Sequence, residues 1–233
     1  MVRNGHGGGK DMLCIKNGTV HDGVHREGFQ ADILVEDGKI KAIGEKLEIP
    51  GDAEVVDAAG LQVYPGFVEA HGHIGLDGSG IGYEGMDYNE LNDIISPQMR
   101  GIDGVKPLDP ALPKAAAAGV TCVCVGPGSA NVLGGTFTTI KTVGRRVDDM
   151  VVRDGVAMKC AFGENPKRVY RDKKDSSRMT TAALLRETLF KAREYMEKKE
   201  AAGDDVSKRP AFDMKLEALL PVMRREIPLK AHA

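Results

Sequence analysis

The spacing of the apolar runs changes near Leu61, and this change divides the sequence into two parts. Before it, short runs rich in β-branched residues are separated by turn dipeptides such as Asn17-Gly18 and Asp37-Gly38. This pattern is typical of a small antiparallel β unit. After it, near-continuous apolar runs such as Val120–Val125 alternate with helical patterns. That alternation predicts a parallel sheet with helices on both faces, an α/β fold.

Three segments are therefore expected. Residues 1–11 are rich in glycine and are interpreted as a flexible leader, residues 12–64 as a small β-sandwich domain, and residues 65–233 as the α/β domain. The expected elements of the α/β domain are strands at 63–70, 120–125, 157–162 and 227–233 and helices at 110–118, 180–202 and 212–225. Residues 126–135 are expected to form a glycine-rich loop.

Charge and hydropathy exclude several classes of protein. Lys and Arg number 32 against 34 Asp and Glu, giving a net charge of −2, which argues against a nucleic-acid partner. No apolar run approaches the ~18 residues needed to cross a bilayer, so a cytoplasmic protein with a small-molecule substrate and no membrane partner is expected. The four cysteines are predicted to be buried, reduced thiols rather than a disulfide framework.

A histidine pair follows the first strand of the α/β domain. Because side chains alternate along a strand, His71 and His73 point the same way, about 6.6–7 Å apart along the backbone. Both imidazoles can then converge on one metal ion at the carboxyl end of the sheet, where α/β folds carry their chemistry. The alternative is a pair of solvent-exposed loop histidines.

Further ligand candidates follow other strands. Glu164, after the strand at 157–162, would supply the negative charge that two neutral imidazoles lack. Lys159 on the same strand could instead carry a bridging carboxylate after carbamylation by carbon dioxide. Strand alternation does not direct both side chains inward, and Glu164 is preferred. His232 ends the last strand, again at a carboxyl end.

Substrate contacts are expected from two loops. The glycine-rich loop offers Ser129 and Asn131, and Arg168 follows Glu164 and could recognise a substrate carboxylate. A plain connector and a solvated turn are the alternatives for these two segments.

Several motifs carry a family resemblance. They are Ile15-Lys-Asn-Gly-Thr-Val20, Tyr64-Pro-Gly-Phe-Val-Glu-Ala-His-Gly-His73, Ala117-Ala-Gly-Val-Thr121 and Phe162-Gly-Glu-Asn-Pro166. With these motifs the sequence resembles the metal-dependent amidohydrolase superfamily, in particular its imidazolonepropionase-like and related branch. The resemblance implies a partial (β/α)8 TIM-type barrel, with about five of eight strands, and a small N-terminal β-sandwich.

The resemblance also implies a reaction and a ligand set. The reaction is hydrolysis of an amide or other C–N bond, including cyclic ones, by metal-activated water. His71, His73, Glu164 and His232 match the family's ligand positions, with Lys159 as the alternative bridging ligand. The expected cofactor is one or two divalent ions, Zn²⁺ first, with Mn²⁺ or Fe²⁺ as alternatives.

The sequence also departs from the family. A histidine after the sixth strand and a proton-shuttling aspartate after the eighth are not matched, so no catalytic residue is expected in this chain. We expect a truncated chain that is inactive alone and becomes complete as a homo-oligomer or with a second chain. The alternative is a non-catalytic structural or assembly protein built on the first half of the scaffold.

Overall fold

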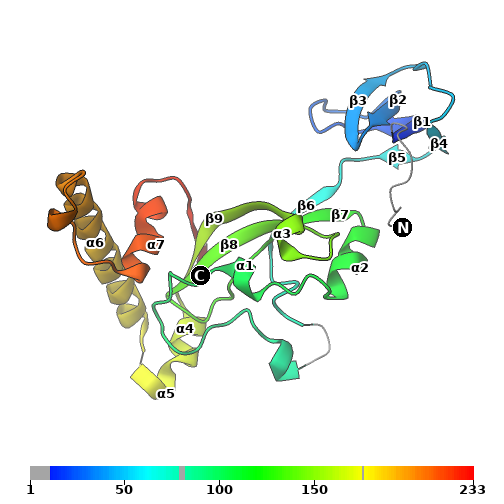
Figure 1. Ribbon diagram of the computed structural model, residues 1–233. Coiled ribbons are helices and arrows are strands. Elements are labelled where there is room, and N and C mark those ends of the chain that lie inside the picture. The colour runs from blue at the N-terminus through cyan, green and yellow to red at the C-terminus, as the bar shows by residue number, and fades with distance from the viewer. Residues whose placement is uncertain (1–10, 79–81, 175) are drawn as a thin grey trace. The chain divides into compact units, whose positions relative to one another are not determined.

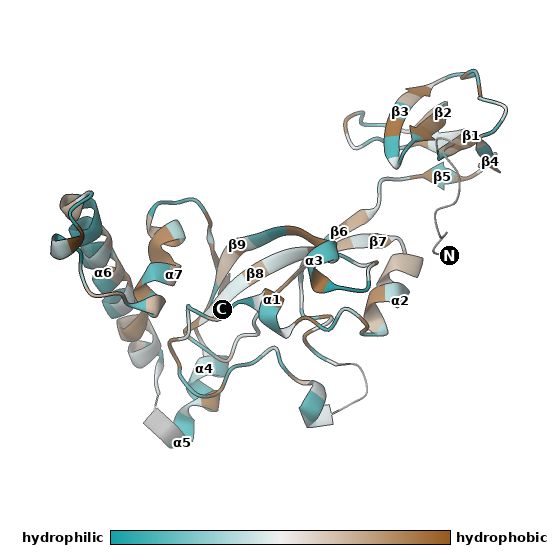
Figure 2. Cartoon of the chain, in the orientation of Figure 1, coloured by the Kyte–Doolittle hydropathy of each residue, from teal (hydrophilic) through white to brown (hydrophobic). Residues whose placement is uncertain are grey.

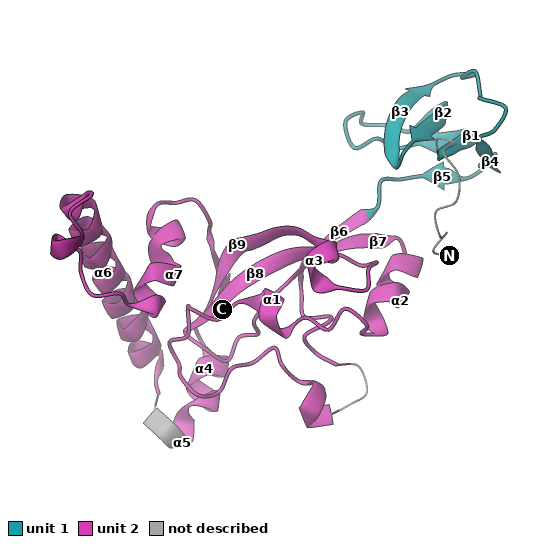
Figure 3. Cartoon of the chain, viewed as in Figure 1, with its two compact units in different colours: residues 1–66 teal, residues 67–233 magenta. Residues whose placement is uncertain are grey.

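The computed structural model of the chain describes residues 11–78, 82–174 and 176–233. The chain divides after Gly66 into two units: unit 1 runs up to Gly66 and unit 2 is Phe67–Ala233 (Figure 3). The leader expected at residues 1–11 lies outside the described residues, apart from Asp11.

Unit 1 is a small sheet. Its strands are β1 (Met12–Val20), β2 (Phe29–Glu36), β3 (Lys39–Gly44), β4 (Glu54–Asp57) and β5 (Gln62–Val63). The order is β3-β2-β1-β4, with β5 also paired to β1; β1 and β3 run antiparallel to β2. Asp37 and Gly38 both have positive φ, which gives the two-residue turn that joins β2 to β3. The apolar residues of β2, brown in Figure 2, form much of the unit's core.

Unit 2 is built on a second five-stranded sheet (Figure 1). Its strands are β6 (Phe67–Gly72), β7 (Val120–Val125), β8 (Leu133–Lys141), β9 (Val151–Ala161) and β10 (Leu229–His232), in the order β10-β9-β8-β7-β6. The outer pairs, β6 with β7 and β9 with β10, are parallel. The central strand β8 runs antiparallel to both of its neighbours.

The prediction of an all-parallel sheet was therefore wrong at β8. The sequence places part of this strand in a glycine-rich loop, because Gly134 and Gly135 open it and threonines fill its middle. Its residues have intermediate hydropathy, so β8 is pale in Figure 2. The strand forms because β7 and β9 supply partners on both sides, which local sequence cannot show.

Helices connect the strands of unit 2. They are η1 (Gly82–Gly85), α1 (Gly101–Gly104), α2 (Ala111–Ala117), α3 (Val147–Met150), α4 (Glu164–Val169), α5 (Arg171–Lys174), α6 (Arg178–Ala202), η2 (Val206–Lys208) and α7 (Met214–Met223). The three helices predicted from the sequence correspond to α2, α6 and α7. A capping box at Ser177 starts α6: its Oγ accepts from the Thr180 backbone N–H, and the Thr180 hydroxyl accepts from the Ser177 N–H.

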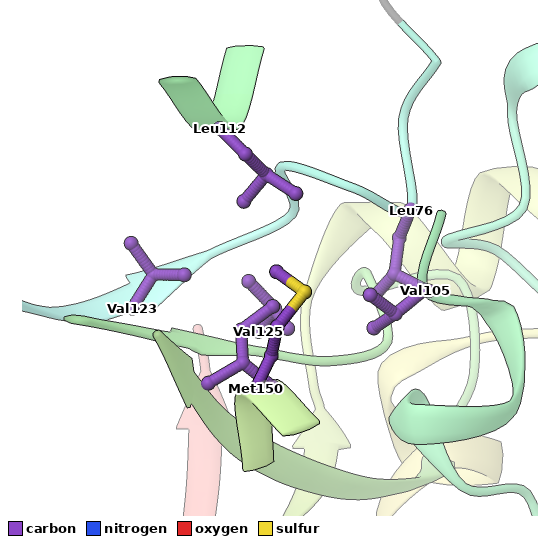
Figure 4. Packing of buried hydrophobic residues seen from close by; sticks show 7 residues of the cluster. Leu76, Val105, Leu112, Val123, Val125 and Met150 are labelled. Atoms are coloured by element: carbon purple, nitrogen blue, oxygen red, sulfur yellow. The ribbon is translucent and has the colours of Figure 1, made fainter. Parts of the chain in front are cut away.

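Two hydrophobic clusters fix which face of the sheet is free for chemistry. One lies on β7 and β8 under α2 and α3 (Figure 4) and contains Leu76, Val105, Leu112, Val123, Val125, Ile140 and Met150. The other joins β8 and β9 to α6 and α7 and contains Leu133, Met158, Cys160, Ala192, Leu219 and Ile227. Because side chains alternate, Cys124 of β7 and Lys159 of β9 lie on the opposite face of the sheet.

All four cysteines are buried and free, as predicted. Within the described ranges, no helix combines the length and the apolar character that crossing a bilayer requires.

Candidate active site

Lys159 lies at the centre of the free face of the sheet. Its side chain is only 1% exposed, and Nζ lies 3.3 Å from His71 Nε2. The Phe137 ring from β8 packs below both groups, 5.1 Å from the His71 ring and 5.6 Å from Lys159 Nζ. The structure thus joins β6 and β9 through a direct lysine–histidine contact.

His71 and His73 lie at the carboxyl end of β6, with their ring centres 5.5 Å apart. His73 Nδ1 is 2.8 Å from the Gly126 carbonyl oxygen. A carbonyl can only accept, so Nδ1 carries the proton and the lone pair is on Nε2. The Tyr88 ring stacks on His73 at 5.3 Å and fixes the orientation of the imidazole. This arrangement is typical of a histidine that is ready to bind a metal through Nε2.

Lys230 connects the two ends of the strand order. From β10 its ammonium donates a hydrogen bond to the Ala70 carbonyl oxygen of β6, and it lies 4.5 Å from the centre of the Phe137 ring. Cys124 Sγ is 3.8 Å away. A side chain of β10 can reach β6 only because the sheet curls, so this contact defines the concave face of the sheet.

Burial and neighbouring basic groups lower the pKa of two side chains on this face, His71 and Lys159. Partial burial, followed by the charges of Lys159, Lys230, His73 and His232, lowers the pKa of His71 to about 4. Burial, together with the neighbouring charge of Lys230, also lowers the pKa of Lys159. His71 is therefore a neutral nitrogen base near neutral pH, the form that binds a metal.

Glu164 occupies a different place from the one expected. The strand β9 ends at Ala161, and Glu164 is the first residue of α4. Its carboxylate is 76% exposed and pairs with Lys167 at 3.3 Å. The structure thus places Lys159, and not Glu164, against His71. The choice between these two residues as a metal ligand stays a prediction.

His232 lies at the end of β10, and its Nε2 is 3.3 Å from Asn165 Nδ2. The same amide nitrogen donates to Ser129 Oγ at 2.7 Å. Ser129 and Arg168, both expected at the substrate, line a cavity of about 210 Å³ that His73 also borders. This cavity therefore adjoins the histidine pair.

Asn131 is not in that cavity. Its side chain is 1% exposed, and its Nδ2 donates to the carbonyls of Glu90 and Asp93 and to the Tyr170 hydroxyl. Its amide holds the segment before α1 against the loop that precedes β8. A substrate contact of Asn131 stays a prediction.

The donor set on the concave face fits a divalent metal in part. Across the described ranges, no three His, Cys, Asp or Glu side chains are close enough to share an ion. His71 and His73 offer imidazole nitrogens, and Lys159 is the buried neighbour that could provide the oxygen ligands as a carbamate. The residues present fit an ion held by two imidazoles and a modified lysine.

Sequence reasoning missed three residues of this face. Asn165 was given no role of its own, Tyr88 belongs to a loop without periodicity, and Phe137 lies on the strand that was not predicted. For Asn165 one local signal was present: the Asn-Pro dipeptide follows a predicted strand, and the residues after the strands of such a fold form its site.

Comparisons with known proteins agree on one family. No family model matches the sequence. The chain is 31% identical over 265 residues to the amidohydrolase tasK of Hapsidospora irregularis, an alignment that covers 97% of this chain and 27% of that protein. The crystal structure of an amidohydrolase from Thermotoga maritima MSB8 superposes with a TM-score of 0.89 at 43% identity. The chain belongs to the amidohydrolase superfamily.

Within that superfamily, the curled sheet of unit 2 and the separate sheet of unit 1 form a partial TIM-barrel amidohydrolase fold, as predicted. The Thermotoga maritima match covers 95% of this chain and 58% of that one. An allantoinase of Escherichia coli is 54% identical over 67 residues, 28% of this amidohydrolase chain and 14% of that enzyme. The chain thus spans only part of the relatives it matches, and the imidazolonepropionase-like branch stays a prediction.

Proposed function

We propose that this chain forms the metal-binding half of a hydrolase that cleaves amide or other C–N bonds. The observation that carries the proposal is the contact between Lys159 Nζ and His71 Nε2, beside a His73 whose Nε2 lone pair is free. The names of the relatives, an amidohydrolase and an allantoinase, support the same class of reaction.

His71, His73 and a carbamylated Lys159 would hold the metal, with His232 as a further ligand. A metal at this place would activate water and polarise the carbonyl of the scissile bond. In its neutral form, which a lowered pKa favours, the Lys159 amine would add to carbon dioxide and lose one proton. The product is a carbamate anion beside the basic side chains of His71 and Lys230. Zn²⁺ is the proposed ion, because it accepts imidazole and carboxylate ligands together.

The chain's own residues prepare this site. The Gly126 carbonyl fixes the His73 tautomer, and Tyr88 holds the plane of its ring. The Phe137 ring closes the floor below His71 and Lys159 and keeps water from that side. Lys230 ties β10 to β6, so that His232 and His71 share one face.

We further propose that additional strands complete the barrel. The strands β6 and β10 stand at the two ends of the strand order, and the β6 residue Val68 is 66% exposed. An edge strand with exposed apolar side chains is a surface for further strand pairing. A second chain that pairs there would also supply the carboxylate that moves the proton between water and the leaving group.

The test is hydrolysis by complementation. The chain is mixed with a second chain that corresponds to the rest of the Thermotoga maritima amidohydrolase, with Zn²⁺ and bicarbonate present. Release of amine from N-acyl amino acids, dipeptides and cyclic amides is then measured. We expect turnover by the mixture that Lys159→Ala abolishes. A folded, metal-loaded complex with no turnover on any of these classes would contradict the proposal.

A further inference from the structure

The cavity beside His73 has an unusual charge balance. Its polar lining comes from His73, Tyr88, Asn89, Ser129, Asn165 and Arg168, and no Asp or Glu lines it. Glu164, next to the lining residue Asn165, is exposed and pairs with Lys167. Asp93, on the loop that leads to α1, pairs with Lys215 at 2.5 Å. Asp87 and Glu90, which flank Tyr88 and Asn89 in the sequence, also have partners: Asp87 pairs with Lys106, and Glu90 accepts from the Asn92 N–H. These four acids are therefore already occupied.

Arg168 is a cation without a counter-ion at this cavity. In the part of the chain that the structure describes it forms no ion pair, and its one hydrogen bond is a long contact of 3.4 Å from Nη2 to Asn165 Oδ1. A guanidinium presents five N–H donors in a planar fork, so most of its donors are free. Such a group pairs best with a planar carboxylate.

Two neutral side chains add donors to the same cavity. Ser129 Oγ accepts from Asn165, which leaves its own hydroxyl proton to donate. Asn89 Oδ1 accepts from the Ala130 N–H, which leaves its Nδ2 hydrogens free. A cavity that offers a guanidinium, a hydroxyl and an amide nitrogen, all as donors, selects an anion.

The cavity also lies within reach of the reacting centre. His73 borders it, and Asn165, which contacts both Ser129 and Arg168, also contacts His232 Nε2. Its volume of about 210 Å³ suits a small group and not a whole extended peptide. A substrate whose anion binds in this cavity would therefore have its scissile bond beside the histidines, if that bond is only a few atoms from the anion.

We propose that this cavity binds the carboxylate of the substrate, with Arg168 as its ion-pair partner and Ser129 and Asn89 as hydrogen-bond donors. The substrate class is then an N-acyl amino acid or a related amide with a carboxylate close to the scissile C–N bond. The inference rests on the proposed hydrolysis only in identifying the bound anion as the substrate.

Binding to the chain, measured by calorimetry, tests the site apart from turnover. The probes are N-acetylglycine and its neutral amide, which differ only in the carboxylate, and the phosphonate analogue. We expect the acid to bind about 10- to 100-fold more tightly than the amide, the range of a charge-assisted hydrogen bond. Arg168→Ala should abolish this preference, and Arg168→Lys should keep part of it.

The matched control is Arg171→Ala, which removes the same charge from an exposed arginine that does not line the cavity. Equal binding of acid and amide by the unmodified chain, no binding of either, or the same loss in the Arg171 variant would overturn the proposal. If the phosphonate binds more tightly than N-acetylglycine, the natural ligand carries a phosphate-type group, and the carboxylate proposal is wrong. Selective binding of the acid without any turnover would contradict only the proposed hydrolysis. Turnover that is unchanged in Arg168→Ala would contradict only the carboxylate site.

Discussion

Replacing Asn131 with alanine separates a structural role from a substrate-binding one. The buried amide nitrogen donates at 2.9 Å to the Glu90 carbonyl, at 2.7 Å to the Asp93 carbonyl and at 3.0 Å to the Tyr170 hydroxyl. Two hydrogens serve three acceptors, so the amide makes about two full hydrogen bonds. The substitution removes both and leaves a small void in the loop.

The expected cost follows from these contacts. At ~1 kcal/mol for each net hydrogen bond, and with the loss of packing, Asn131→Ala should destabilise unit 2 by about 2–3 kcal/mol. The two carbonyls keep second donors, from the Tyr170 hydroxyl and the Ser96 hydroxyl, which limits the loss. For a domain of this size that corresponds to a fall in Tm of about 4–12 °C.

Thermal unfolding followed by circular dichroism measures this change. The control is Ser129→Ala, in the same loop, which removes one partly buried hydrogen bond and should lower Tm by no more than about 4 °C. An unchanged Tm for Asn131→Ala, together with weaker binding of N-acetylglycine, would refute the structural role and restore Asn131 to the substrate.

Three further predictions concern the backbone, a buried phenol and a helix start. Gly135→Ala should prevent β8 from folding, because φ is +104° and a Cβ would lie 2.3 Å from the Met99 carbonyl oxygen. The expected results are loss of soluble expression and of the native circular dichroism spectrum. The control Gly155→Ala, at φ +61° with open space around the Cβ, should lower the free energy of unfolding by only about 1 kcal/mol. Burial, with the charges of nearby acids, raises the pKa of Tyr170 to about 12, so the unfolded chain loses this proton first and stability should fall as pH rises from about 10 to 12. Phenolate absorbance should show a late phase that Tyr170→Phe removes, and its persistence in that variant would contradict the assignment. Ser177→Ala should destabilise α6 by about 1 kcal/mol in denaturant unfolding, and an unchanged midpoint would contradict the capping box.

The parts of the fold that local pattern determines were predictable. The turn at Asp37-Gly38, the long helix α6 and the strand β6, which contains His71, follow from glycine positions, helical spacing and apolar runs. The strand β8 was not predictable, because its glycines and threonines favour a strand only between two existing partners. That one strand also changes the sheet from parallel to mixed.

The site was predictable to a similar extent. Strand alternation places Lys159 correctly on one face, but it does not reveal that β9 ends at Ala161 and turns Glu164 into the first residue of a helix. In the same way, local sequence indicates that Asn131 is an exposed loop residue. In the structure it is buried, because Tyr170, which is distant in the sequence, packs against it. The position of Glu164 depends on the direction of the chain after β9, and the burial of Asn131 depends on long-range packing. Local sequence determines neither of them.

Metal content tests the central claim most directly. The purified chain is loaded with Zn²⁺ in the presence of bicarbonate, passed through a desalting column and analysed by mass spectrometry of the metal. We predict stoichiometric Zn²⁺ that is lost in Lys159→Ala and in the double variant His71→Ala/His73→Ala, and retained in His25→Ala, which changes an exposed histidine of unit 1. Zn²⁺ content that is the same in all four proteins, or absent from the unmodified chain, would contradict the metal site on the concave face.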